Sequence, residues 1–115
     1  MLKVADIALT GIKANILKMD AASNNISNAN TPDYKNVRVP TVESVGGGTR
    51  GTPIKDTQAG NLVINSDTGK IEESSNTSIA VEFTNLMSAE RGVQSNMTVI
   101  KTSDELLGTL FDIKA

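Results

Sequence analysis

The chain has 115 residues, of which 38% are hydrophobic and only 3% aromatic, and it lacks cysteine, histidine and tryptophan. Its 13 acidic and 11 basic residues give a formal net charge of −2, which provides no basic surface for nucleic acid or an anionic membrane. The missing residue types exclude disulfides, thiol chemistry and the commonest general base and zinc ligands. We therefore expect one domain that is not an enzyme and needs no metal or cofactor.

The first 26 residues predict a helix from about residue 2 to about residue 28, because apolar residues recur at alternating steps of three and four. Charged residues interrupt the apolar ones throughout, so we expect neither a cleavable signal peptide nor a membrane span. The stripe is either the contact with another helix of the same chain or also a seam for subunit assembly. Its candidate seam residues are Leu9, Ile12, Ile16, Met19 and Ile26.

The helix must end within residues 24–35, which read NNISNANTPDYK. Asparagine tolerates the left-handed conformation of a helix end, and Pro32 cannot continue a helix. One asparagine is enough for termination, yet the stretch holds four. Their amides either cap the helix locally or bond to polar groups across a subunit contact. On the second interpretation, Asn25→Ala and Asn28→Ala change the stability of the isolated protein by less than about 1 kcal/mol.

Residues 36–78 predict a small, partly ordered β segment. Short β-prone runs occupy residues 37–39 and 62–64, and residues 65–69 have turn composition before a returning strand at 70–72. The glycines of the GGGTRGT stretch at 46–52 favour a flexible linker. It lacks the lysine and the following helix of a phosphate-binding loop.

Residues 79–115 predict a second long helix after the polar cluster at 74–78. Gly92 and Gly108 weaken it by about 1 kcal/mol each relative to alanine, so bends or frays are expected there. The candidate seam residues of this helix are Phe83, Leu86, Val93, Met97, Ile100 and Leu107.

Both ends of the chain resemble the flagellar axial proteins, the rod, hook and hook-associated family. The N-terminal signature of that family reads like A-x-N-N-I-x-N-x-N-T-x-G-[YF]-K, and its C-terminal segment like VDLxxEFVNLIxAQRAYQANxKVIxTxDEMLxTLLxL. The chain departs at Asp33, where the family usually has glycine, and at Gly92-Val93, where it usually has alanine and an aromatic residue. The family-motif residues present here are Asn24, Asn25, Asn28, Asn30, Thr31 and Tyr34.

The resemblance implies a mainly α fold with a small β insertion, in which two long terminal helices form a coiled coil. We expect an N-terminal helix and motif at 1–35, a middle segment at 36–78 and a C-terminal helix at 79–115, within one domain. The implied role is a structural subunit of the bacterial flagellar basal-body rod, polymerising through its terminal helices into the axial drive shaft.

The implied partners are other rod and hook proteins, copies of the chain itself and the flagellar type III export apparatus, with no nucleic acid and no membrane insertion. The implied location is the periplasmic rod, reached without a cleaved signal peptide. The alternative is a soluble coiled-coil adaptor or an export-chaperone-like binding module, which should fold alone. Axial proteins should instead be poorly ordered at both ends until they polymerise.

Overall fold

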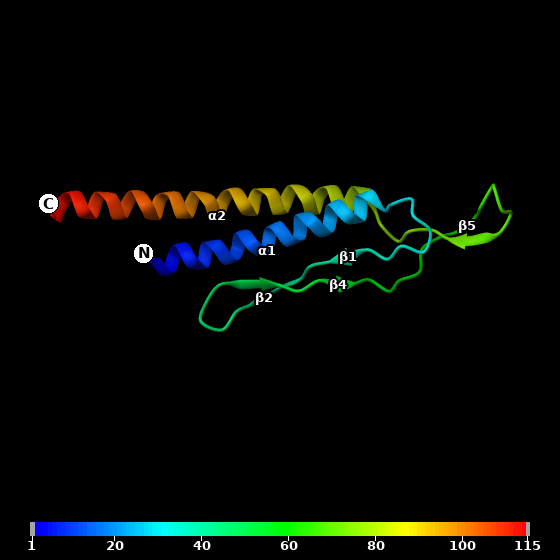
Figure 1. The fold of residues 1–115 in the computed structure, drawn as a ribbon, viewed down its shortest axis with the longest axis horizontal. Helices are drawn as coiled ribbons and strands as arrows, with labels where there is room; N and C mark the ends of the chain where they lie inside the picture. Colours follow the sequence, from blue (N-terminus) through cyan, green and yellow to red (C-terminus); the bar gives the residue numbers. More distant parts are fainter. Residues whose placement is uncertain (1, 115) are drawn as a thin grey trace.

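The computed structural model describes residues 2–114 and consists of two long helices joined by a β-containing segment (Figure 1). Helix α1 spans Leu2–Ser27 and helix α2 spans Ile79–Lys114, which corresponds to lengths of about 39 and 54 Å. The helices lie side by side in opposite directions, and the molecule measures 77 × 24 × 15 Å. The prediction of a mainly α fold with a small β insertion is confirmed.

Both helices begin or end close to the predicted residues. After α1 ends at Ser27, the Asn28 amide still donates to the Asn24 carbonyl at 3.1 Å. Helix α2 begins after Ser78, whose carbonyl accepts from the Glu82 amide at 3.0 Å, and Glu82 places an acid in the first turn, where the helix dipole favours it. The fraying expected at Gly92 and Gly108 is wrong, because α2 is continuous through both, and Figure 1 shows no kink in it.

The middle segment forms three two-stranded antiparallel ribbons. The predicted hairpin after residue 61 is confirmed, and the linker predicted at 46–52 is corrected, since part of it is a strand. The glycines at 46–48 have positive φ and make the turn of a second hairpin, which the composition alone did not reveal. The pairs are β1 (Val37–Arg38) with β4 (Ile54–Lys55), β2 (Thr41–Glu43) with β3 (Thr49–Gly51), and β5 (Leu62–Ile64) with β6 (Ile71–Glu73).

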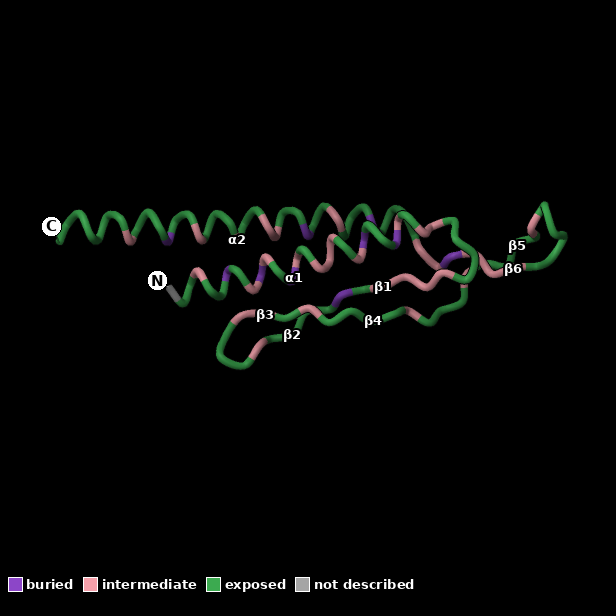
Figure 2. Tube along the Cα trace, viewed as in Figure 1, coloured by how far each residue is buried: buried purple, intermediate pink, exposed green. Residues whose placement is uncertain are grey.

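The β2–β3 hairpin packs against α1 through small groups. The Thr10 hydroxyl donates to the Ile7 carbonyl at 2.6 Å and accepts from the Thr49 amide at 3.1 Å. A Cβ added to Gly51 would lie 2.8 Å from Val39 Cγ1, so glycine permits the close approach of β3. Figure 2 shows that buried positions are few. The buried hydrophobic residues are Ala8, Ala14, Ala22, Val39 and Ala89.

Candidate functional site

Two glycines and two asparagines meet where α1 packs against α2. A Cβ added to Gly11 would lie 2.7 Å from Asn96 Nδ2, and a Cβ added to Gly92 would lie 2.6 Å from Asn15 Nδ2. Each asparagine amide thus occupies the space that a side chain on the opposing helix would need. We call these four residues the Gly–Asn clasp.

The clasp is reciprocal, because each helix contributes the same glycine-to-asparagine spacing of four residues. Asn15 Nδ2 donates to the Gly11 carbonyl at 2.9 Å, and Asn96 Nδ2 donates to the Gly92 carbonyl at 2.8 Å. Each amide is therefore held on its own helix by a side-chain to backbone bond one turn back. In an antiparallel pair this places each asparagine over the glycine of the partner helix, which fixes the register of α1 against α2.

The candidate seam residues divide into two groups in the structure. Those that lie half-buried are Ile12, Met19, Ile26, Leu86, Val93, Ile100 and Leu107. Four others, Leu9, Ile16, Phe83 and Met97, are 43–58% exposed. The contact between the chain's own helices therefore leaves these four side chains largely uncovered. Their role in assembly stays a prediction.

Asn25 connects α1 to the start of the β segment and is completely buried. Its Nδ2 donates to the Val37 carbonyl at 2.7 Å, while its Oδ1 accepts from the Val37 amide at 2.8 Å and from the Tyr34 hydroxyl at 3.0 Å. The side-chain amide of Asn25 thus bonds to both main-chain groups of Val37, as a residue of a neighbouring strand would. This geometry corrects the interface interpretation for Asn25, whose amide bonds within its own chain.

The other asparagines of the motif lie nearer the surface. Asn28 Nδ2 donates to the Asn24 carbonyl at 2.9 Å, and its Oδ1 accepts from the Thr31 hydroxyl at 3.1 Å, so its bonds are those of a local cap. Asn24 and Asn30 are exposed. Asp33, which stands where the resembling family usually has glycine, has a φ of 60°, the left-handed conformation that glycine adopts at least cost.

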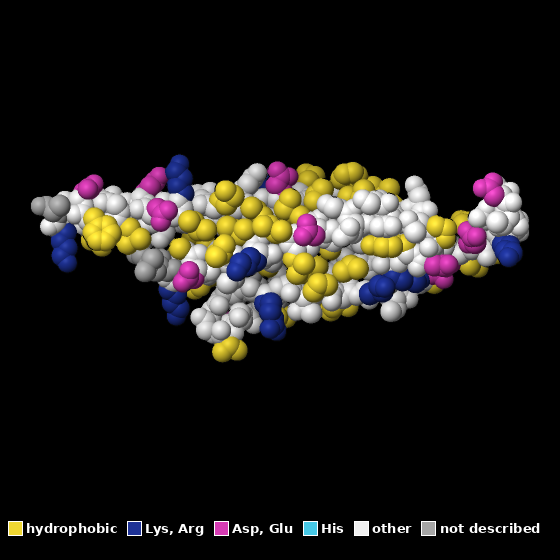
Figure 3. All heavy atoms as spheres, viewed as in Figure 1, with side chains coloured by type: hydrophobic (Ala, Val, Ile, Leu, Met, Phe, Trp, Pro, Cys, Tyr) yellow, Lys and Arg dark blue, Asp and Glu magenta, His cyan; other side chains and the backbone are white. Residues whose placement is uncertain are grey.

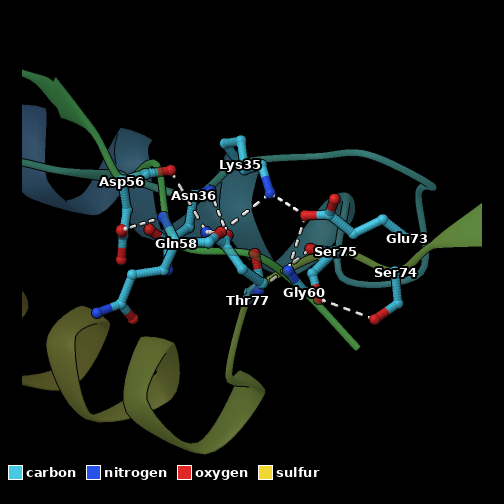
Figure 4. Close-up of polar contacts among 10 residues, drawn as sticks. Lys35, Asn36, Asp56, Gln58, Gly60, Glu73, Ser74, Ser75 and Thr77 are labelled. Atoms are coloured by element: carbon cyan, nitrogen blue, oxygen red, sulfur yellow. Dashed lines mark hydrogen bonds and ion pairs between the residues drawn. The ribbon is translucent and has the colours of Figure 1, made fainter. Parts of the chain in front are cut away.

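A polar network joins the base of the β5–β6 hairpin to the segment between α1 and β1 (Figure 4). Lys35 pairs with the Glu73 carboxylate, which also accepts from the Gly60 amide at 2.8 Å. Lys35 Nζ donates to the Gln58 carbonyl at 2.9 Å. The hydrogen bonds from Lys35 and then from Gly60 hold the pKa of Glu73 below its ordinary value. Asn76 adds a further link, because its Oδ1 accepts from the Asn36 amide at 2.7 Å.

A shallow groove of about 290 Å³ runs between α1, α2 and β1, with Lys18 and Arg38 among its lining residues. Glu82 also lines it and is 5% exposed, and among residues 2–114 no side chain forms a hydrogen bond or ion pair with its carboxylate. Burial, and then the charge of Glu82, raise the pKa of Tyr34. Tyr34 therefore keeps its proton and remains a donor to Asn25.

Large apolar side chains are exposed along both helices, and Figure 3 shows them gathered in a band over the helix pair. No helix within residues 2–114 combines the length and apolar character needed to cross a bilayer. The same residues contain no group of three or more histidine, cysteine or acidic side chains placed to hold a metal ion.

Comparison with known families identifies both ends of the chain. Residues 6–35 match the model described as flagella basal body rod protein, and residues 69–113 match the flagellar basal body rod FlgEFG protein C-terminal model. A comparison with curated proteins gave no match. The two models together take in about two thirds of the sequence, and each falls on one helix and its adjoining junction. Both ends of the chain therefore match flagellar basal-body rod families, and these matches support a structural role in the basal-body rod.

Proposed function

We propose that the chain is a rod subunit that polymerises through α1 and α2 and carries torque as part of the axial drive shaft. The observation that carries this proposal is that the apolar residues of the two helices fall into a half-buried group and an exposed group. The chain's own helix contact uses small and half-buried residues, whereas Leu9, Ile16, Phe83 and Met97 remain largely exposed. Contiguous apolar surface of this kind is typical of protein–protein contacts.

The elongated shape supports the same proposal. A molecule of 77 × 24 × 15 Å exposes helices along much of its length, and contacts between different faces of identical subunits propagate as a helix when the rotation does not close. The proposed partners are copies of the chain and other rod and hook proteins. We propose further that the chain reaches the periplasmic rod through the flagellar type III apparatus without signal cleavage.

The test replaces exposed apolar residues of the helices with charge. Leu9→Asp and Met97→Asp should leave the stability of the isolated chain within about 0.5 kcal/mol, because both side chains are exposed. In an assembled rod each would place a charge in an apolar contact, where desolvation is costly. We expect both variants to be exported, to be absent from purified basal bodies and to abolish swimming.

Val45→Asp is the matched control, since Val45 is a fully exposed valine in the β2–β3 turn and belongs to neither helix. It should swim normally. Normal swimming and normal basal-body content of both helix variants would contradict assembly through these faces. Recovery of the wild-type chain in the cytoplasm with an export substrate, and never in basal bodies, would favour the adaptor or chaperone-like module instead.

A further inference from the structure

The Gly–Asn clasp marks the faces on which α1 and α2 meet. An α-helix turns by about 100° per residue, so Leu9 and Ile16 project roughly 140–160° away from Gly11. By the same geometry, Phe83 and Met97 project roughly 140–180° away from Gly92. These four large apolar side chains therefore lie on the faces opposite the clasp, in agreement with their exposure.

An alternative packing of the same helices is available in principle. The larger apolar residues follow heptad-like spacing, and burying them against each other gives more hydrophobic stabilisation than burying alanine and glycine does. The observed packing competes with this alternative because the two helices approach closely at their glycines. Each glycine is in contact with an asparagine amide of the opposing helix, and a hydrogen bond to the preceding turn already holds that amide in place.

We propose that Gly11, Asn15, Gly92 and Asn96 are positioning residues that keep the large apolar faces of α1 and α2 turned outward. The use of these faces for assembly rests on the proposed function. The orientation itself is a property of the single chain. If the clasp holds each helix in its observed rotation about its own axis, the side chains available to other subunits are Leu9, Ile16, Phe83 and Met97.

The orientation can be measured through a single thiol, because the chain has no cysteine of its own. In the full chain carrying Ile16→Cys, kept dilute and monomeric, the thiol should react with a maleimide at nearly the rate of the urea-unfolded chain. Adding Gly11→Leu and Gly92→Leu prevents close approach and should slow the reaction about tenfold or more, because the helices now bury their larger side chains. Met97→Cys should report the same change from α2.

Gly108→Leu is the matched control, since a Cβ at Gly108 meets no other atom within 4 Å. It should leave both labelling rates unchanged. Unchanged rates in the Gly11→Leu and Gly92→Leu chain, with its helix content retained in circular dichroism, would overturn the proposal.

A second measurement decides the matter if the leucine variants unfold. Gly92→Ala should lower the urea midpoint relative to Gly108→Ala, and adding Asn15→Ala should restore it, whereas adding Asn96→Ala should not. Equal midpoints for Gly92→Ala and Gly108→Ala would overturn the proposal. Because these measurements use the monomer, their failure is distinct from a failure of rod assembly, which the Leu9→Asp and Met97→Asp variants test.

Discussion

Replacing Asn25 with alanine should destabilise the isolated chain far more than an interface role would allow. The substitution removes three hydrogen bonds, two to the main chain of Val37 and one from the Tyr34 hydroxyl. A buried group left without its partner costs about 1–3 kcal/mol, although water can reach the half-buried Val37 and recover part of this. We therefore expect a loss of about 2–4 kcal/mol, a large part of the roughly 5–15 kcal/mol typical of a domain.

The loss is measured by urea unfolding followed by circular dichroism, and it is located by hydrogen exchange. The Val37 amide should lose its protection in Asn25→Ala, because Asn25 Oδ1 is its acceptor. Asn28→Ala removes only local capping bonds and should cost about 1 kcal/mol or less. Asn30→Ala, at an exposed position, should cost almost nothing. A loss below about 1 kcal/mol with the Val37 amide still protected would refute this account of Asn25.

Three further predictions concern the junction around the β5–β6 hairpin. Asp33→Gly should raise the free energy of unfolding by up to about 1 kcal/mol in urea, because it relieves a left-handed residue with φ of 60°. The lowered pKa of Glu73 means that its contact with Lys35 stabilises the fold above about pH 4.5, and this contribution is lost as pH falls through the lower folded-state pKa. Glu73→Gln should remove that part of the acid dependence of the urea midpoint, and an unchanged dependence would contradict it. Gly60→Ala should lower thermal stability, since the new methyl group would collide with the Ser74 carbonyl, and a Tm equal to wild type would count against that close approach.

Local chemistry made much of the fold predictable from the sequence. The asparagine-rich stretch and Pro32 gave the end of α1 to within a residue or two, and the turn composition at 65–69 gave the β5–β6 hairpin. The strands β2, β3 and β4 were missed because β3 packs against α1 and β4 pairs with the distant β1, neither of which composition reveals. Three consecutive glycines occur in flexible linkers as well as in hairpin turns, so residues 46–48 alone do not distinguish the two.

The helix contact was harder to predict, because hydrophobic periodicity gives weight to large residues. Periodicity selected Leu9, Ile16, Phe83 and Met97, which the structure leaves exposed. The signal that would have found the actual contact is the repeated spacing from Gly11 to Asn15 and from Gly92 to Asn96. Glycine and asparagine are poor helix formers, so their recurrence at the same spacing on both helices indicates a packing constraint.

The small size of the buried hydrophobic residues gives a physical reason for the proposed assembly of the chain into a rod. Among residues 3–114 the buried hydrophobic residues are four alanines and one valine, and each alanine contributes little apolar area. Polar contacts such as those of Asn25 and Glu73 therefore carry much of the specificity of the isolated fold. Binding to neighbouring subunits adds free energy that grows with their concentration relative to the dissociation constant. This chain uses small residues in the contact between its own helices and leaves large apolar residues exposed. It should thus gain most of its stability in the proposed rod assembly.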